Sequence, residues 1–204
     1  MTVINFEKEV VYKLYAALVD EGFERINKSS VNYSINSDFK CWVSLALAKT
    51  KGGYMLIPNI GLHVVPIQKM FCEFSKGQYQ KKYSRNTATY PNSLYDIENI
   101  MNEKRFYFLE DQSDSFMSSE AKRLAKIYCN QGLEYVRSIA SYEKLIDLLK
   151  PNVLNLGGKP EKYALCLHFL GKNEEAKDFL ESFSDDYKKY IEGFSKNFIE
   201  MIGK

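Results

Sequence analysis

Cysteine and histidine, the side chains that most often bind metals or act as nucleophile and base, are scarce in this sequence. There are four cysteines and two histidines among 204 residues, and no two cysteines lie at the short spacing of a zinc or redox motif. We therefore expect buried free thiols that pack as small hydrophobic groups. Neither His63 nor His168 has a Ser or Cys nucleophile in a recognisable turn beside it. A catalytic Cys–His arrangement is recognised by geometry rather than by order along the chain, so the sequence alone leaves it open.

Long apolar runs are also missing, and no leader segment is expected. No stretch approaches the roughly 20 apolar residues that a membrane helix needs. The first twenty residues include Glu7, Glu9 and Asp20, which do not fit the charged-then-apolar order of a signal peptide. The glycine pairs at 52–53 and 157–158 fit turns better than a phosphate-binding loop. We expect a soluble, cytoplasmic protein with no metal or cofactor and no membrane partner.

A strong excess of charge of either sign is absent. Lys and Arg number 28 and Asp and Glu 26, so the formal net charge is +2. Proteins that bind DNA usually have a clear basic excess, and nucleic acid is therefore not the expected partner. Apolar residues make up 45% of the chain and charged residues 26%, which is typical of a globular protein with a real core.

An alternating apolar pattern from Val31 to Val65 predicts an antiparallel β-meander. Apolar and polar residues alternate at 31–35 and 39–47, with a polar turn at 36–38 between them. A third apolar run follows the glycine pair, and its Pro58 predicts an edge, a bulge or a division into two short strands. The second strand is apolar on both faces, which predicts a strand covered on each side.

Helical spacing predicts helices on both sides of this meander. They are expected at 5–21, 66–74, 117–139 with a kink at Gly132, 142–149 before Pro151, 160–170, 174–183 capped by Asn173, and from 185 or 186 to 202; a further strand is expected at 105–109. Residues 163–183 resemble one unit of the tetratricopeptide type, but no second copy follows, so an ordinary αα-hairpin is expected there.

These elements predict an α+β fold, in which an N-terminal helix and an antiparallel β-meander are packed with a C-terminal multi-helix bundle. The composition changes near Ser115, so we place the sheet portion at 1–114 and the helical portion at 115–204. No Pro/Gly/Ser-rich linker separates the two portions, and one compact unit is therefore expected.

Two polar stretches have no evident role in core packing and are the candidate partner-binding surfaces. The first is a basic and aromatic excursion that contains Tyr79, Lys81, Lys82, Tyr83, Arg85 and Tyr90. Rings between cations can stack on bases and hold phosphates, can dock on an acidic protein surface, or can simply form a solvated loop.

The second stretch is an acidic turn with Glu110, Asp111 and Asp114. Such carboxylates can bind a divalent cation or act as an acid–base pair. Their spacing lacks the pattern of a calcium loop, and acids just before a helix also favour its positive N-terminal end. The sequence leaves these interpretations open.

The layout of the chain resembles that of bacterial toxin-immunity proteins, including those of contact-dependent growth inhibition. The resemblance lies in an opening helix that ends at residues 20–23 (Asp-Glu-Gly-Phe), a meander that ends at residues 59–62 (Asn-Ile-Gly-Leu), and a helical tail. It implies a non-enzymatic protein that binds a cognate toxin domain and blocks it. Such proteins are often acidic, and the net charge of +2 departs from that pattern.

The expected function is therefore a protein-binding inhibitor that neutralises a toxin. One alternative is a nucleic-acid-associated accessory protein that binds through residues 76–90. Another is a hydrolase that uses Cys or acidic residues.

Overall fold

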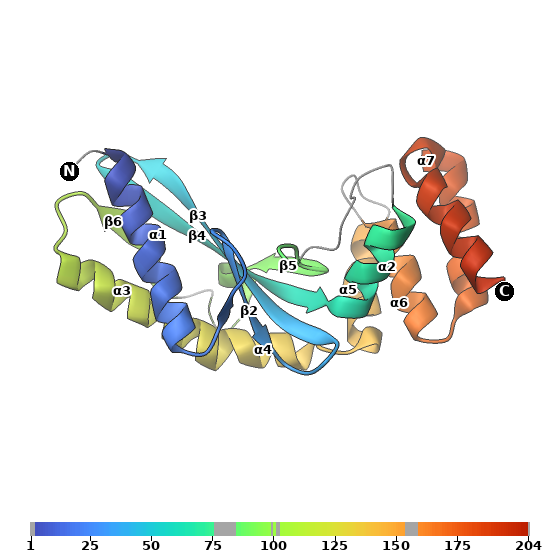
Figure 1. The fold of residues 1–204 in the computed structure, drawn as a ribbon, viewed down its shortest axis with the longest axis horizontal. Helices are drawn as coiled ribbons and strands as arrows, with labels where there is room; N and C mark the ends of the chain where they lie inside the picture. The colour runs from blue at the N-terminus through green and yellow to red at the C-terminus, as the bar shows by residue number, and fades with distance from the viewer. Residues whose placement is uncertain (1–2, 76–84, 99, 101–102, 154–158, 204) are drawn as a thin grey trace. The chain divides into compact units, whose positions relative to one another are not determined.

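The computed structural model describes residues 3–75, 85–98, 100, 103–153 and 159–203 (Figure 1). It confirms the α+β fold. The chain divides into two compact units: unit 1 comprises residues 1–62 and 86–138, and unit 2 comprises residues 63–85 and 139–204. This division differs from the predicted boundary at 114/115, because the helix that begins at Asp114 packs on the N-terminal helix of unit 1.

An antiparallel sheet forms the centre of unit 1. Its strands are β1 (Glu24–Arg25), β2 (Ser30–Ser34), β3 (Phe39–Thr50), β4 (Gly53–Val64), β5 (Tyr90–Ser93) and β6 (Tyr107–Leu109). The strand order is β1-β2-β3-β4-β5, and β6 also pairs with β4. The predicted meander is thus present as β2, β3 and β4, and the strand expected at 105–109 is β6.

β4 is one continuous strand whose outer edge is shared by two shorter strands. β6 pairs with residues 53–55 and β5 with residues 59–62. The Leu56 N–H donates to the Phe106 carbonyl (3.0 Å), and the Leu62 carbonyl accepts from Thr89 (2.7 Å). Because backbone groups alternate between the two edges of a strand, Pro58 faces this same edge. It lies between the two partner strands, where a missing N–H removes no ladder hydrogen bond.

Helices of unit 1 cover one face of the sheet. They are α1 (Val3–Asp20), α3 (Asp114–Ile127), the π-helical turn η2 (Tyr128–Gly132) and α4 (Leu133–Ser138), with the 3₁₀ turn η1 (Leu94–Asp96) after β5. Phe6 of α1 packs against Tyr54 of β4, with ring centroids 6.2 Å apart. A Cβ on Gly132 would lie 2.9 Å from Cδ1 of Ile60. Tyr54 and Ile60 share one face of β4, so α1 and η2 cover that face together.

Local sequence signals explain where these helices end or change. The kink predicted at Gly132 coincides with η2, where the absent side chain lets the helix approach the sheet. α1 ends at a left-handed Gly22 (φ 94°). The Gly22 N–H donates to Val19 O and the Phe23 N–H to Leu18 O, the hydrogen-bond pattern of a Schellman cap. The predicted C-cap is therefore confirmed.

The described elements of unit 2 are helices, apart from the end of β4 at residues 63–64. The helices are α2 (Val65–Phe74), α5 (Tyr142–Val153), α6 (Pro160–Phe169) and α7 (Asn173–Ile202), and α6 packs against the other three. Phe74 contacts the rings of Phe194 and Phe198 at centroid distances of 5.9 and 6.1 Å. α6 and α7 form the expected αα-hairpin, with Gly171 (φ 74°) at the turn.

Three helix boundaries predicted in unit 2 are wrong. α5 continues through Pro151 to Val153, because a proline near the end of a helix removes little of its hydrogen bonding. α7 continues across 184–186, where there is neither proline nor glycine to end it. Its N-cap is Lys172 rather than Asn173, because the Asn173 amide oxygen is bonded to His168 Nδ1 (2.8 Å).

Candidate protein-binding surfaces

The basic and aromatic excursion is only partly described. Tyr79, Lys81, Lys82 and Tyr83 lie outside the described residues. Arg85 is exposed, and Tyr90 is half-buried in β5, opposite Leu62.

Tyr90 is packed within unit 1. Burial, followed by the neighbouring Tyr135 hydroxyl, raises the pKa of Tyr90. The next alternate residue of the strand, Asn92, donates to the Tyr135 hydroxyl at 3.3 Å. The sheet pairing of β5 therefore sets the position of Tyr90.

The acidic turn is present between β6 and α3. Glu110 and Asp111 are exposed there. Asp114 begins α3, and its carboxylate lies 2.7 Å from Lys13 Nζ on α1. The hydrogen bond from Lys13 lowers the pKa of Asp114. Asp114 thus holds α3 to α1, whereas Glu110 and Asp111 face solvent.

The described residues show neither a group of metal-binding side chains nor an activated thiol at Cys129 or Cys166. Within them, no three His, Cys, Asp or Glu residues are grouped as ligands for a metal ion. Burial raises the pKa of the Cys129 thiol to about 11 and that of Cys166 to about 12, so both are poor nucleophiles near neutral pH. His168 is bonded to the Asn173 amide rather than to a thiol.

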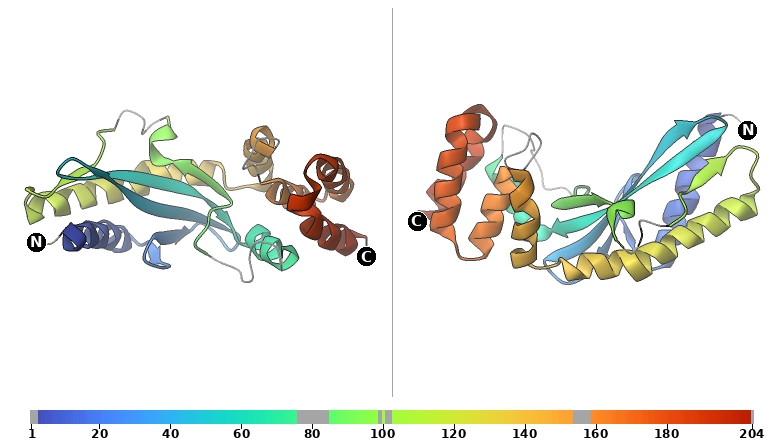
Figure 2. Two further views of the ribbon diagram at one scale, coloured as in Figure 1. Left: turned by 90° about the horizontal axis from the view of Figure 1, so that it is seen from above. Right: turned by 180° about the vertical axis from the view of Figure 1, so that it is seen from behind.

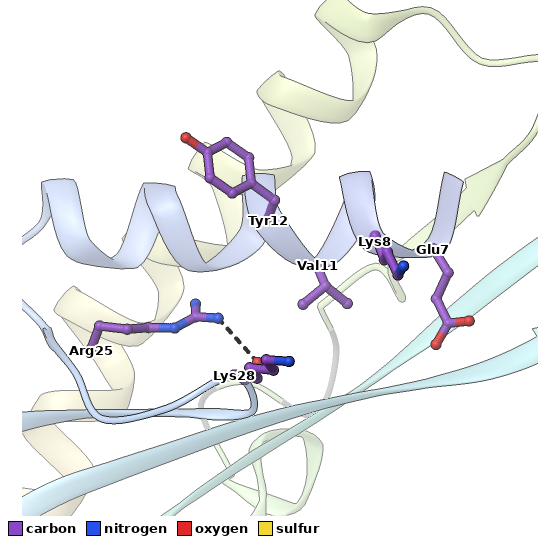
Figure 3. Close-up of a pocket in the computed structure, with 6 residues that line it drawn as sticks. All are labelled: Glu7, Lys8, Val11, Tyr12, Arg25 and Lys28. Carbon is purple, nitrogen blue, oxygen red and sulfur yellow. Dashed lines mark hydrogen bonds between the residues drawn. The ribbon is translucent and has the colours of Figure 1, made fainter. Parts of the chain in front are cut away.

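A groove that the sequence did not indicate lies between α1 and the β1–β2 turn (Figure 3). Its volume is about 540 Å³, and it is lined by Glu7, Lys8, Val11, Tyr12, Arg25 and Lys28. Three of these side chains are cationic and one is anionic, so the groove favours an anionic ligand. Lys8 and Tyr12 are one helical turn apart, but only the fold places them beside Arg25 and Lys28.

Next to this groove, β3 is longer than β2, the strand that pairs with it on this side. The β2–β3 pairing ends at Ser30 and Ser44, whereas β3 continues to Thr50. Figure 2 shows β3 and β4 continuing as a hairpin beyond β2. Before Ser30 the chain does not run along β3, because residues 26–29 form the turn that joins β2 to β1. In this turn the Ile26 and Asn27 N–H groups donate to Ser30 O.

The backbone of this β3 extension presents an unpaired edge. Phe39 O accepts from Ile35 and Asn36 on the β2 side of β3. Since backbone groups of alternate residues point to the same edge, those of Leu45, Leu47 and Lys49 point there too. The Leu45 N–H is met by the Tyr15 hydroxyl at 3.1 Å. Among the described residues, no strand pairs with Leu47 or Lys49 on this side.

Tyr15 joins the groove to this edge. The Arg25 guanidinium carbon lies 3.7 Å from the centroid of the Tyr15 ring, and Arg25 Nη2 donates to Lys28 O (3.0 Å). Burial raises the pKa of Tyr15, while its hydrogen bond from Leu45 and the charge of Arg25 act in the opposite direction. The groove therefore begins where the pairing of β2 with β3 stops and the unpaired edge of β3 starts.

The face of the sheet opposite the helices has exposed apolar side chains. Ile57 is 41% exposed and Tyr107 is 44% exposed, and Met55, opposite Tyr107, is half-buried. The sequence predicted that the strand at 39–47 is covered on both faces; on this face of β3, Ala46 is exposed, so that prediction is wrong at this position. Trp42 on this face is half-buried, and its indole N–H donates to Asn86 O at 2.8 Å.

The chain was compared with known proteins. No model of a protein family, no curated protein and no solved structure matches it. Among the described residues, no helix combines the length and apolar character needed to cross a membrane.

Proposed function

We propose that this chain is a protein-binding inhibitor of the immunity type, which binds one bacterial toxin domain and neutralises it. The observation that carries the proposal is the unpaired edge of β3 beside the groove of α1. A strand edge offers its N–H and C=O groups to any other strand, and folded proteins normally cover or shorten such edges. An edge left open beside a charged groove is therefore suited to a protein partner.

The open face of the sheet supports the same proposal. Ile57 and Tyr107 expose apolar surface, and the turn that follows β6 has the exposed carboxylates of Glu110 and Asp111. Aromatic residues with a polar rim are typical of protein interfaces. The toxin class of the partner comes from the layout of the sequence, which resembles immunity proteins.

The proposal is tested with the reading frames that flank the gene. A toxin-like frame beside it would be expressed with and without this chain, and growth of the host would be recorded. We expect growth to be restored by co-expression and a one-to-one complex in size-exclusion chromatography. A toxin-like neighbour that remains toxic and forms no complex, or the absence of such a neighbour, would contradict the proposal.

Binding of single-stranded nucleic acid is a second candidate, favoured by the cations of the groove and the adjacent Tyr12, which is 73% exposed. Arg and Lys beside an exposed ring can hold phosphates and stack a base. This candidate predicts RNA binding that weakens steeply as salt is added. Filter binding that detects no affinity for single-stranded RNA at low salt would exclude it.

A further inference from the structure

We infer that an extended, acidic segment of the partner pairs with the free edge of β3, residues 45–50, as an additional strand in line with β2. This inference rests on the proposed protein-binding function and specifies how the partner is held. The added strand would continue the sheet where the β1–β2 turn leaves it. Its side chains that face α1 would enter the groove of Figure 3.

The backbone of β3 favours a peptide as the occupant. Leu47 and Lys49 each direct an N–H and a C=O to the same edge, so donors and acceptors alternate along it. An extended peptide presents the matching alternation, and main-chain hydrogen bonds are the source of affinity in strand addition. A nucleic acid backbone has acceptors but no such row of donors.

Tyr15 determines where the added strand begins. Its hydroxyl already accepts the hydrogen bond of the Leu45 N–H, so the first free donor on the edge is the N–H of Leu47. The Leu45 carbonyl points to the same edge and remains available to the strand. Arg25 lies on the Tyr15 ring. It is therefore placed at the end of the added strand that is nearest β2.

The charges of the groove specify an acidic segment. Lys8, Arg25 and Lys28 oppose the single carboxylate of Glu7, and Lys49 on the edge is exposed. Carboxylates on the added strand would meet these cations, which fixes orientation and rejects basic segments. Exposed Tyr12 at the groove provides an aromatic contact of the kind that often dominates interface energy.

The test uses two short blocked peptides with the full-length chain. In both peptides every second residue is charged, and the residues between are Val or Thr. The charged residue is Glu in one peptide and Lys in the other. We expect the Glu peptide to bind at least about tenfold more tightly by fluorescence anisotropy, a difference of about 1.4 kcal/mol. Amide hydrogen exchange should show slower exchange at Leu47 and Lys49 when the Glu peptide is bound.

Charge reversal locates the site. The double variant Arg25→Glu, Lys28→Glu should lose the preference for the Glu peptide. The matched control is Lys122→Glu, Lys126→Glu, which makes the same charge change at exposed positions of α3 and should bind the Glu peptide like the wild-type chain. Circular dichroism identifies a variant that fails to fold, and the single variant Lys8→Glu then replaces the double one.

Three outcomes would overturn the inference. The first is that the Glu peptide does not bind, or that it binds without slowing amide hydrogen exchange at Leu47 and Lys49. Another is binding of a single-stranded RNA oligonucleotide that Arg25→Glu, Lys28→Glu abolishes without protecting those amides, which would assign the groove to nucleic acid. The third is a dimer in light scattering whose edge amides are already protected, which would assign the edge to a second copy.

The same variants separate this inference from the proposed function. If the chain neutralises a toxin and Arg25→Glu, Lys28→Glu does so equally well, the strand addition is wrong and the immunity function stands. If the Glu peptide pairs with the β3 edge but no toxin is neutralised, the edge binds a protein of another class.

Discussion

Tyr15 connects three parts of unit 1 through one side chain. It is 1% exposed on α1, its ring lies under Arg25 of β1, and its hydroxyl accepts from the Leu45 N–H of β3. A hydroxyl in this position supplies the hydrogen bond that a neighbouring strand would otherwise make. The stability of the β3 extension therefore depends on a helix side chain.

Replacing Tyr15 by Phe should destabilise the protein by about 1–2 kcal/mol, because the Leu45 N–H loses its partner while the ring remains in place. Urea unfolding measures the change. Tyr12→Phe is the matched control, since Tyr12 is 73% exposed and surface changes usually alter stability by less than about 0.5 kcal/mol. Equal effects of the two substitutions would contradict the role assigned to the Tyr15 hydroxyl.

The ion pair between Lys13 and Asp114 makes a prediction about pH. Lys13 lowers the pKa of Asp114, so the pair stabilises the fold above the usual titration range of an aspartate, about pH 4, and this stabilisation is lost as the pH falls through the lowered pKa. Lys13→Met should raise the pKa of Asp114 toward that usual value. Carboxyl-detected NMR titration measures it, and an unchanged pKa would show that Lys13 is not the cause.

At the scale of elements, helix α3 begins with a side-chain cap and is fixed to α1 beside it. Ser113 Oγ accepts the Phe116 N–H at 3.2 Å, and Asp114 in the next position pairs with Lys13. Ser-Asp at a helix start satisfies a free N–H group and places negative charge at the positive end of the helix. This arrangement explains the position of Asp114 at the start of α3.

Removing the cap should weaken α3 without changing its packing. Ser113→Ala is expected to cost about 1 kcal/mol, whereas Ser113→Asp should keep most of the stability because a carboxylate also caps a helix. Thermal unfolding of the two variants provides the comparison. An alanine variant as stable as the aspartate variant would show that the Phe116 N–H needs no side-chain cap.

Elements with a local signal could be predicted from the sequence. Gly22 ends α1, alternation defines β2 and β3, and Gly132 marks the change in the long helix. The boundaries in α5 and α7 could not be predicted as well, because Pro151 is tolerated near a helix end and tertiary packing decides whether a helix continues.

The candidate site was harder to predict than the fold. The groove is made by side chains of α1 and of the β1–β2 turn, which no periodic pattern connects. The free edge of β3 depends on β2 being shorter than β3, which is a difference between two strands rather than a motif. The acidic turn, by contrast, was visible in the sequence as Glu110, Asp111 and Asp114, although only the fold shows that Asp114 is paired.

At the scale of the whole chain, each compact unit is assembled from distant segments. Unit 2 combines residues 63–85 with residues 139–204, and α2 packs on α6 and α7 across that sequence separation. Unit 1 likewise takes in α3 and α4 after the strands. The order of elements in the sequence is therefore a poor guide to which of them share a core.

This division predicts which amides lose protection together. Leu165 of α6 is completely buried, and Leu165→Ala should cost about 2–5 kcal/mol because it leaves a cavity. Native-state hydrogen exchange should then accelerate in α2 as well as in α5, α6 and α7, since they share a core. Acceleration that spares α2 would place that helix outside unit 2.

The position of Pro58 has a consequence for how the length of this chain can vary. β5 and β6 pair with separate parts of β4, and the proline leaves a gap between them in which no ladder hydrogen bond continues from one strand to the other. The register of each short strand is therefore set independently. A change in the length of the connection between β5 and β6 therefore shifts the register of neither strand along β4.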